Sequence, residues 1–322
     1  MRGGYNEAVK NYDVIVVGGG HAGIEAAWAA SQIGARTALV TLSVETIGQM
    51  SCNPAIGGIG KGQIVREVDA MGGLMGRCAD ATGVQFRMLN ASKGPAVRGP
   101  RCQSDRFAYA AWMQRELAAA SNLDILEAEC RDLVIESGRC VGVKILTPAG
   151  EQTLSAGAVI LTAGTFLGGE MHLGEETFSG GRINEPACNA LSESLRAAGI
   201  ELARLKTGTP PRLDGETIDY SRCERQDGDA EPRPFSFLND SLTVEQIPCW
   251  LTATNEVIHE HCRENFHRAP LFTGQIDSLG PRYCPSFETK LERFSEKESH
   301  QIFLEPEGRT TNWVYANGIS TS

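Results

Sequence analysis

Cysteine and glycine residues are crowded into one short stretch of the chain, "MSCNPAIGGIGKGQ" at residues 50–63. A cysteine thiolate is a nucleophile, and glycines allow the backbone to approach a ligand closely. The stretch resembles a phosphate-binding loop, but Ala55 stands where that loop needs a glycine, and Gly62 where it needs a hydroxyl for magnesium. The pattern therefore argues against a nucleotide triphosphatase, and the ligand that Cys52 and these glycines approach has to be sought in the rest of the chain.

A second glycine pattern, G-x-G-x-x-G, lies near the start of the chain. The run "DVIVV" before it is typical of a buried strand, and "AGIEAAWAASQIG" and "TALVT" after it predict a helix and a second strand. In that context the glycines allow a tight turn, a close approach to a pyrophosphate and close helix packing. We therefore expect a dinucleotide at the six consecutive residues Gly18, Gly19, Gly20, His21, Ala22 and Gly23, with the His21 side chain used for packing.

The acidic residue that usually holds the ribose of such a dinucleotide is missing. It should follow the glycines by about 20 residues, but Thr41 stands there and the nearest carboxylate is Glu45. We therefore expect the ribose to be recognised in another way.

The elements further along the chain indicate which dinucleotide fold this is. "DILEAECRDLVIESGRCVGVKIL" predicts short strands with a turn at Ser137-Gly138, and "GAVILTAGTFLGG" predicts another buried strand that returns beside the first. A β-meander followed by such a strand is typical of two-dinucleotide flavoproteins. The sequence thus predicts an α/β fold with a Rossmann-like FAD-binding domain at 1–212, and the polar "RQDGDAEPRPFSF" opens an inserted second α/β domain at 213–322.

Charge restricts the partners of the protein. The net charge of −10 argues against nucleic-acid binding over the whole surface. The segment from Arg87 to Arg106 is nevertheless cationic, and Lys93, Arg98 and Arg101 in it are candidate contacts for a polyanion, the alternative being a solvated loop with scattered ion pairs. No apolar run is long enough to cross a membrane and no signal peptide is evident, which predicts a cytoplasmic protein.

Ten cysteines raise the question of metals and disulfides, but none are spaced as C-x-x-C, so neither a zinc ribbon nor a redox motif is indicated. "HEHCRENFH" looks metal-like, yet on a helix His259 and His261 point to different sides. We expect no metal site.

Six stretches closely resemble the glucose-inhibited division protein A family: "GGGHAGIEAA", "GQMSCNPAIGGIGKGQIVREVDAMGGLM", "QFRMLNASKGPAVRGPRCQSDR", "LKTGTPPR", "GPRYCPSFETKLERF" and "HQIFLEPEG". The resemblance runs from about Tyr12 to the last residue and corresponds to the N-terminal half of family members. It implies that the closing part of the FAD domain and a helical C-terminal region lie outside this chain. The family is the FAD subunit of the enzyme that places 5-carboxymethylaminomethyl or aminomethyl groups on the wobble uridine of tRNA.

The resemblance also implies roles for particular residues. FAD would contact Gly18 to Gly23 and backbone near Cys130 and Cys188, although the family usually has serine at the latter position. Cys52 and Cys284 would be catalytic, the first in a flavin-facing loop. NADH would bind through one segment of the second domain, Gly280, Pro281, Arg282, Tyr283, Cys284, Pro285, Ser286, Phe287, Glu288, Thr289, Lys290, Leu291, Glu292, Arg293 and Phe294.

The same resemblance implies partners. The substrate would be tRNA, and a folate-binding GTPase would join a homodimer of this subunit in a heterotetramer. Three alternatives stay open: a folate- and FAD-dependent tRNA uracil-5-methyltransferase, a truncated non-catalytic fragment that binds tRNA or the partner, and a flavin dehydrogenase of small metabolites. The cationic segment disfavours the last of these.

Overall fold

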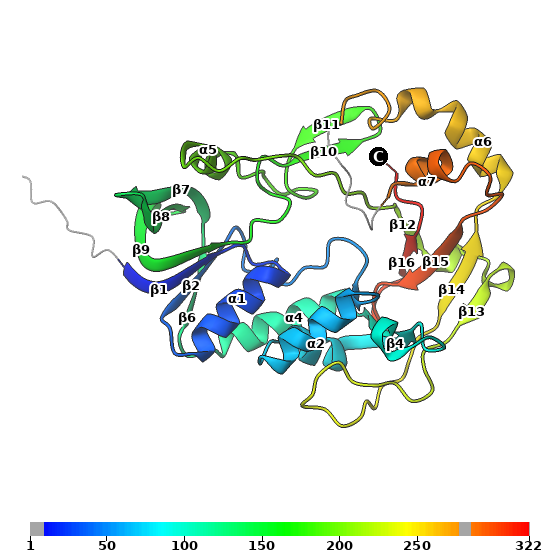
Figure 1. Ribbon diagram of the computed structural model, residues 1–322, viewed down its shortest axis with the longest axis horizontal. Coiled ribbons are helices and arrows are strands. Elements are labelled where there is room, and N and C mark those ends of the chain that lie inside the picture. Colours follow the sequence, from blue (N-terminus) through cyan, green and yellow to red (C-terminus); the bar gives the residue numbers. More distant parts are fainter. Residues whose placement is uncertain (1–9, 277–284, 322) are drawn as a thin grey trace, which may run out of the picture. The chain divides into compact units, whose positions relative to one another are not determined.

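The computed structural model describes residues 10–276 and 285–321, and these form two compact units (Figure 1). Unit 1 consists of residues 1–49, 110–171 and 179–202, and unit 2 of residues 50–109, 172–178 and 203–322. These units do not coincide with the ranges 1–212 and 213–322 expected from the sequence. The difference arises because the segment that carries Cys52 and the cationic residues belongs to unit 2 rather than to the glycine motif's unit.

Unit 1 is built on a six-stranded sheet with the order β6-β2-β1-β9-β8-β7. Its central strands are parallel, since β1 pairs with β2 and β9, and β2 with β6. The meander β7-β8-β9 is antiparallel, and its first turn has Ser137 and Gly138 at positive φ, as the sequence predicts. The strands are β1 (Lys10–Val17), β2 (Thr37–Thr41), β6 (Leu123–Glu127), β7 (Glu129–Glu136), β8 (Arg139–Thr147) and β9 (Gly150–Leu161).

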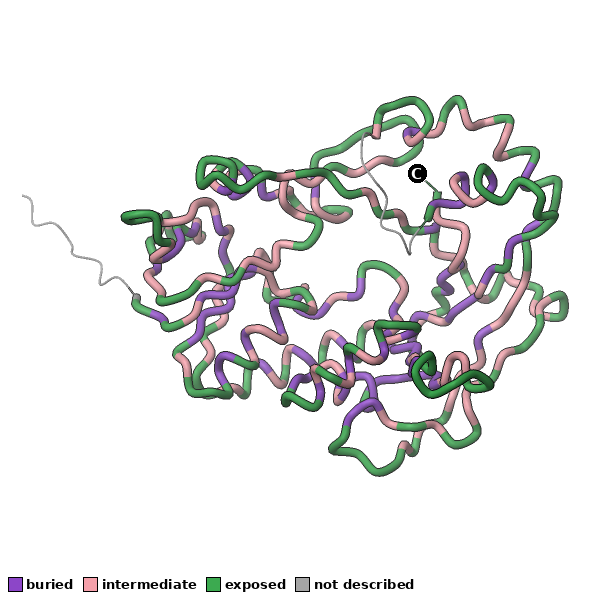
Figure 2. The backbone as a smooth tube through the Cα atoms, viewed as in Figure 1, coloured by how far each residue is buried: buried purple, intermediate pink, exposed green. Residues whose placement is uncertain are grey.

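Apolar side chains of these strands form the core of unit 1. Every residue of β2 is buried, and Figure 2 shows the burial that follows these strands. Helix α1 (His21–Gln32) contacts β1 and β2 and buries Ile24 and Ala27, while α5 (Asn189–Ala197) packs on β7. Helix α4 (Arg106–Ala118) also belongs largely to this unit. The Rossmann-like α/β arrangement expected from the sequence is therefore present.

Unit 2 contains a five-stranded sheet of order β12-β16-β15-β14-β13 and a three-stranded sheet of order β3-β5-β4. Among the described residues every strand pair of both sheets is antiparallel. The strands are β3 (Ala55–Gly57), β4 (Gly83–Leu89), β5 (Gly99–Ser104), β12 (Arg212–Asp214), β13 (Glu224–Gln226), β14 (Cys249–Ala253), β15 (Gln301–Pro306) and β16 (Trp313–Asn317). The helices are α2 (Lys61–Ala70), α3 (Met75–Thr82), α6 (Glu256–Glu264) and α7 (Phe287–Arg293).

The remaining strands, β10 (Glu170–Leu173) and β11 (Glu176–Ser179), form a separate hairpin. Across residues 10–276 and 285–321, no helix combines the length and the apolar character needed to cross a membrane.

Candidate functional site

Three glycines, Gly18 to Gly20, form the turn between β1 and α1, and a fourth, Gly23, lies in the first turn of α1. The structure separates their roles. Gly18 has a φ of +109°, and a Cβ there would lie 2.5 Å from the carbonyl oxygen of Thr162. A Cβ at Gly23 would overlap the carbonyl oxygen of Gly18, and one at Gly19 would lie 2.8 Å from Oγ1 of Thr41. These three glycines are therefore required by the packing of the protein itself.

Gly20 is different, because a Cβ there would meet no atom within 4 Å. Its φ of −78° and ψ of −177° are open to any residue, so neither backbone strain nor packing requires a glycine. Open space over Gly20 fits a ligand that approaches the backbone closely. Gly20 is also the N-cap of α1, where no side chain caps the helix and the first turn has no acidic residue. The N–H groups and the dipole of a helix N-terminus favour an anion such as a pyrophosphate.

The side chains around this turn include an imidazole, a hydroxyl and two exposed carboxylates. His21 follows Gly20, and burial lowers the pKa of its imidazole, so the ring is uncharged at neutral pH. At the end of β2, Oγ1 of Thr41 donates a hydrogen bond of 3.2 Å to the carbonyl of Ser43. Beside Thr41 on β6, Glu127 accepts the N–H of Val44, whereas Glu45 is exposed.

Cys130 and Cys188, where backbone contacts to FAD are expected, are buried thiols in unit 1. Burial is the main cause that raises the pKa of Cys130 to about 12 and that of Cys188 to about 11. Thiols with such pKa values are almost entirely protonated at neutral pH and are poor nucleophiles. Any contribution of these residues to a cofactor site is therefore through the backbone or through packing.

Unit 2 surrounds Cys52 with polar side chains of its sheet. Cys52 is exposed, and its Sγ lies 3.0 Å from Oη of Tyr315. Arg212 donates hydrogen bonds from Nη2 to the carbonyls of Ser51 and Cys52, at 3.1 and 3.2 Å. Asn53, the next residue, donates from Nδ2 to Glu305. The loop that contains Cys52 is thus fixed at three successive residues.

Two buried carboxylates anchor the groups around this loop. Glu307 is fully buried and accepts hydrogen bonds of 2.8 Å from both Arg106 and Arg212. Glu305 pairs with Arg101 at 2.6 Å, and burial raises the pKa of its carboxyl, an effect that Arg101 opposes. Sequence reasoning assigned no role to Arg212, Glu305 and Glu307, although they stand in the quoted motifs "LKTGTPPR" and "HQIFLEPEG".

The cationic residues Lys93, Arg98 and Arg101 lie in different environments. Arg101 is on β5, 15 % of its side chain is exposed, and its guanidinium is taken up by Glu305 and Gln103. Lys93 and Arg98 are exposed and lie in the turn between β4 and β5, where Nε of Arg98 donates to the carbonyl of Lys93. The structure therefore favours an anchoring role for Arg101 and leaves the other two at the surface.

The first part of the segment expected to bind NADH, Gly280 to Cys284, lies outside the described residues. Cys284, which is expected to be catalytic, is the last of these residues. From Pro285 onward the segment forms α7, which Ser286 caps by accepting the N–H of Thr289. Phe287, Glu288 and Leu291 are buried, and Nζ of Lys290 donates to the carbonyl of Gly318 at 2.7 Å. Glu292, Arg293 and Phe294 at its end are exposed.

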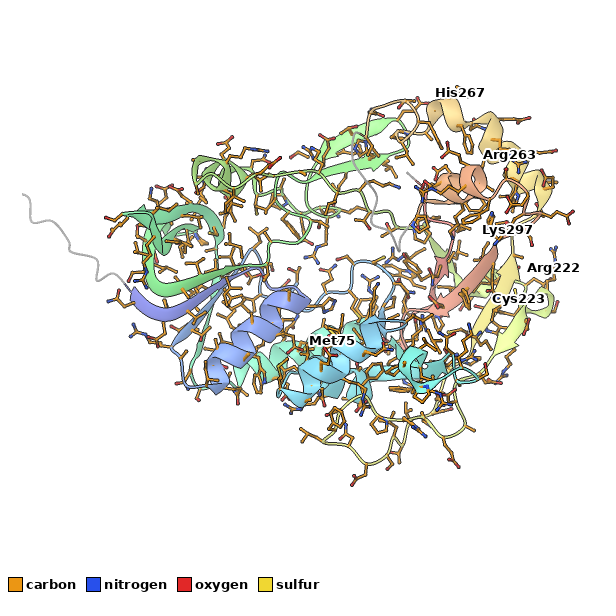
Figure 3. The ribbon with its side chains drawn as sticks, viewed as in Figure 1. Met75, Arg222, Cys223, Arg263, His267 and Lys297 are labelled. Carbon is orange, nitrogen blue, oxygen red and sulfur yellow. The ribbon has the colours of Figure 1, made fainter. Side chains whose placement is uncertain are left out.

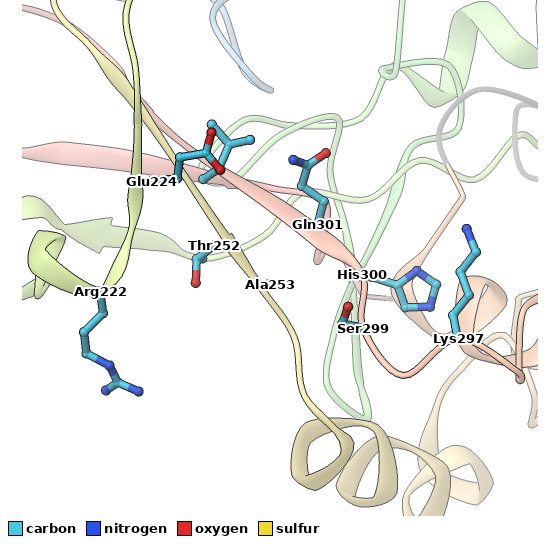
Figure 4. A pocket seen from close by; sticks show the side chains of 9 residues that line it. Arg222, Glu224, Thr252, Ala253, Lys297, Ser299, His300 and Gln301 are labelled. Carbon is cyan, nitrogen blue, oxygen red and sulfur yellow. The ribbon is translucent and has the colours of Figure 1, made fainter.

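Arg222 and Lys297, both labelled in Figure 3, line a cleft of about 600 Å³ at the edge of β14. Glu224, Thr252, Ser299 and His300 are also in its wall (Figure 4). Its lining is polar and carries charges of both signs. None of the described residues expected to bind NADH lines it. Across the described residues, no group of three or more His, Cys, Asp or Glu side chains is arranged to hold a metal ion.

Comparisons with known proteins place the chain in a family. The model of a family described as "Glucose inhibited division protein A" matches residues 13–322. The tRNA uridine 5-carboxymethylaminomethyl modification enzyme MnmG of Rhodopirellula baltica is 53% identical over 97% of this chain and 49% of its own length. The same-named enzyme of Salinibacter ruber is 53% identical over 97% of this chain and 47% of its own length.

A solved structure gives the same result. Aquifex aeolicus GidA in its form I crystal has a TM-score of 0.91 and is 48% identical, covering 97% of this chain and 53% of that chain. The chain thus spans about half the length of the relatives it matches. The resemblance inferred from the sequence motifs is confirmed: the chain belongs to the glucose-inhibited division protein A family.

Proposed function

We propose that the chain forms the cofactor-binding half of an enzyme that modifies the wobble uridine of tRNA at carbon 5. The modification would be a carboxymethylaminomethyl or aminomethyl group, FAD the cofactor and NADH its reductant. Support comes from the names of the relatives, which are tRNA uridine modification enzymes, and from the turn that precedes α1.

The observation that carries the FAD assignment is the open space over Gly20 at the uncapped N-terminus of α1. Gly18, Gly19 and Gly23 shape the turn, and backbone N–H groups of His21 and Ala22 would face the pyrophosphate. Bound there, FAD would supply two-electron redox chemistry.

Chemistry on the base would fall to a thiol. Cys52 is exposed and hydrogen-bonded to Tyr315, so a bound uracil ring could be attacked by its thiolate or receive a proton from its thiol. Cys284 is the second candidate for the same roles. Its sequence position in the segment that resembles the family's NADH-binding motif is the ground for including it.

Binding of tRNA would use exposed cations. Lys93 and Arg98 lie at the surface of the turn between β4 and β5, where they could neutralise backbone phosphates. A folate-binding GTPase would be the partner protein, with this subunit as a homodimer inside a heterotetramer in the cytoplasm. The family resemblance is the ground for these partners.

The proposal is tested in a full-length protein in which this chain replaces the matching half of a relative. The purified protein should be yellow and should show flavin bleaching by NADH in stopped-flow measurements. Mass spectrometry of tRNA nucleosides should detect the modified uridine only when the GTPase is also present. A colourless protein without modification would contradict the proposal and favour a non-catalytic binding function.

The roles of the two cysteines are tested by replacing each with serine, which keeps the size nearly constant. Cys52→Ser and Cys284→Ser should still bind FAD and consume NADH, while at least one should leave the uridine unmodified. Cys140→Ser, in the meander of unit 1, is the matched control and should behave as wild type. Full modification by both variants would remove these cysteines from the mechanism. Loss of bleaching together with modification would indicate a damaged cofactor site.

A further inference from the structure

We propose that Tyr315 is a positioning residue that holds the Cys52 thiolate, and that Arg212 and Glu305 fix the loop around it. The reaction of the thiolate with a base rests on the proposed function. The positioning of Cys52 rests on contacts within unit 2 alone.

Strand pairing brings the three residues into one row. Tyr315 on β16 is the direct partner of Arg212 on β12 and of Glu305 on β15. Direct partners on adjacent strands project from the same face of a sheet, so all three side chains lie on one face. The three side chains contact three consecutive loop residues: Arg212 contacts Ser51 and Cys52, Tyr315 contacts Cys52, and Glu305 contacts Asn53.

The middle of the row is rigid. Only 3% of Tyr315 is exposed, and the guanidinium of Arg212 lies 4.9 Å from the centre of its ring. Arg212 is itself held by Glu307, which Arg106 also pairs with. A phenol held in this way presents its hydroxyl to Sγ of Cys52 in one orientation.

The hydroxyl acts differently on the two forms of the thiol. A thiolate has no hydrogen to donate, so in that form Tyr315 must be the donor, and a hydrogen bond to a charged acceptor is stronger than one to a neutral acceptor. The contact therefore holds Sγ of a thiolate in one position, with its other lone pairs on the side away from Tyr315. The facing charged groups are Arg212, Arg101 and Arg106 and the carboxylates Glu305 and Glu307.

The test is the pH dependence of alkylation. Iodoacetamide would be added to the folded chain between pH 6 and pH 10, and modification of the Cys52 peptide would be followed by mass spectrometry. Tyr315→Phe removes only the hydroxyl that holds Sγ, so we expect the alkylation of Cys52 to be slower across this pH range. At pH 7 the alkylation rate should fall by about three- to tenfold.

Two controls separate positioning from damage. Cys223, at the end of a short 3-10 turn (Tyr220–Arg222) before β13 and labelled in Figure 3, should keep its alkylation profile in the same sample. Tyr220→Phe removes another phenol of unit 2, one that packs against Trp250, and should leave the Cys52 profile unchanged. Urea unfolding of both variants checks that they are folded.

The outcomes distinguish this inference from the proposed function. An unchanged Cys52 profile in folded Tyr315→Phe overturns the positioning role. A lowered profile in the full-length protein with a matching fall in the rate of uridine modification, and with flavin bleaching unchanged, supports both. A lowered profile with an unchanged modification rate supports the positioning role and removes Cys52 from catalysis. If Tyr315→Phe does not fold, Asn53→Ala gives a second test. This change releases the loop from Glu305 and should also lower the Cys52 alkylation rate. An unaltered rate would overturn the proposal that Arg212, Glu305 and Tyr315 position Cys52.

Discussion

Two glycines near the start of α1, Gly20 and Gly23, differ in whether the surrounding structure has room for a side chain. Gly23 has no room for a Cβ because the carbonyl oxygen of Gly18 is in its place. Gly20 has room, and the space above it belongs to no atom of the described chain. The two positions should therefore respond to the same substitution in different ways.

We expect Gly20→Ala to leave the stability of unit 1 unchanged but to lower its affinity for FAD at least tenfold, because the added methyl group stands where the pyrophosphate must approach. Gly23→Ala should instead destabilise unit 1, since the backbone of the turn has to move. Flavin titration by fluorescence and urea unfolding would be measured on both variants. Equal FAD affinity of Gly20→Ala and wild type would contradict the assigned site.

Glu307 compensates the positive charges of two arginine side chains in unit 2. It is fully buried and pairs with Arg106 and Arg212, whose side chains are 11% and 21% exposed. Glu307→Gln removes the charge and leaves two guanidinium groups uncompensated, which should cost about 3–5 kcal/mol in the free energy of unfolding.

The matched control for this change is Glu175→Gln, which removes an exposed partner of Arg268. An exposed ion pair is screened by water, so urea unfolding of this variant should match the wild type. Similar unfolding curves for Glu307→Gln and wild type would show that the buried pair is not what holds β12 and β15 at the loop.

At the scale of elements, α6 and α7 are held on the sheet of unit 2 by aromatic and imidazole rings. His259 on α6 is fully buried and accepts or donates a 2.7 Å hydrogen bond with Thr254. His300, at the start of β15, lies 5.4 Å from it between ring centres and meets Phe287 of α7 edge-on at 5.9 Å. Burial is the main cause that lowers the pKa of His300, and the charges of His259, Lys290 and Lys297 add to it, against a smaller opposite effect of Glu296.

The lowered pKa of His300 gives a pH dependence with a definite sign. Between its ordinary value of 6.5 and the lower native value, the unfolded chain binds a proton that the folded chain does not. Unit 2 should therefore lose stability as the pH falls below 6.5. His300→Phe keeps an aromatic ring against Phe287 and should flatten this dependence. Urea unfolding at pH 7.5 and 5.5 measures it, and an equal loss in both proteins would contradict the assignment.

The sequence predicted those elements whose signal is local. Strand β1, helix α1 and the meander follow from apolar runs and glycines within about 30 residues. Asn255, a residue type that favours helix N-termini, caps α6 by accepting the N–H of Ile258. Strands β4 and β5 were missed because their buried positions include the polar Gln85, Gln103 and Ser104. Their hydrogen bonds go to residues far along the chain, such as Gln226 and Pro306.

The candidate site also has one part that could be predicted from the sequence and one part that could not. The glycines before α1 could be predicted, because the motif and its flanking elements are contiguous. The row formed by Arg212, Glu305 and Tyr315 could not be predicted. It depends on the register of β12, which lies about 100 residues before β15 and β16, and no local pattern encodes that register.

For the whole molecule, the net charge of −10 opposes the approach of any nucleic acid. The proposed binding of tRNA would then depend on a local cationic surface and be sensitive to salt. We expect Lys93→Ala and Arg98→Ala each to weaken tRNA binding and to flatten its log–log salt dependence by about one unit per lost phosphate contact. Arg101→Ala should instead lower stability, because the buried Glu305 carboxylate loses its cationic partner.

Filter binding between 50 and 200 mM salt, with NADH-driven flavin bleaching as the control, would measure the three variants in the full-length protein. Bleaching should be unaffected by the two surface changes. An identical salt slope for Lys93→Ala, Arg98→Ala and wild type would place the tRNA surface elsewhere.

The pairing of β1 with β9 also has a consequence for synthesis in the cell. Asn11 and its partner Ser155 are 144 residues apart, and these strands form the middle of the sheet of unit 1. At a translation rate of about 5–20 residues per second, β1 leaves the ribosome roughly 7 to 29 s before β9. Throughout that interval one edge of an apolar strand is without its neighbour and is open to pairing with other nascent chains. Chaperone binding to the nascent chain would therefore raise the yield of native protein. A slowly translated stretch before β9 would lengthen the exposure of β1, whereas one after β9 would not.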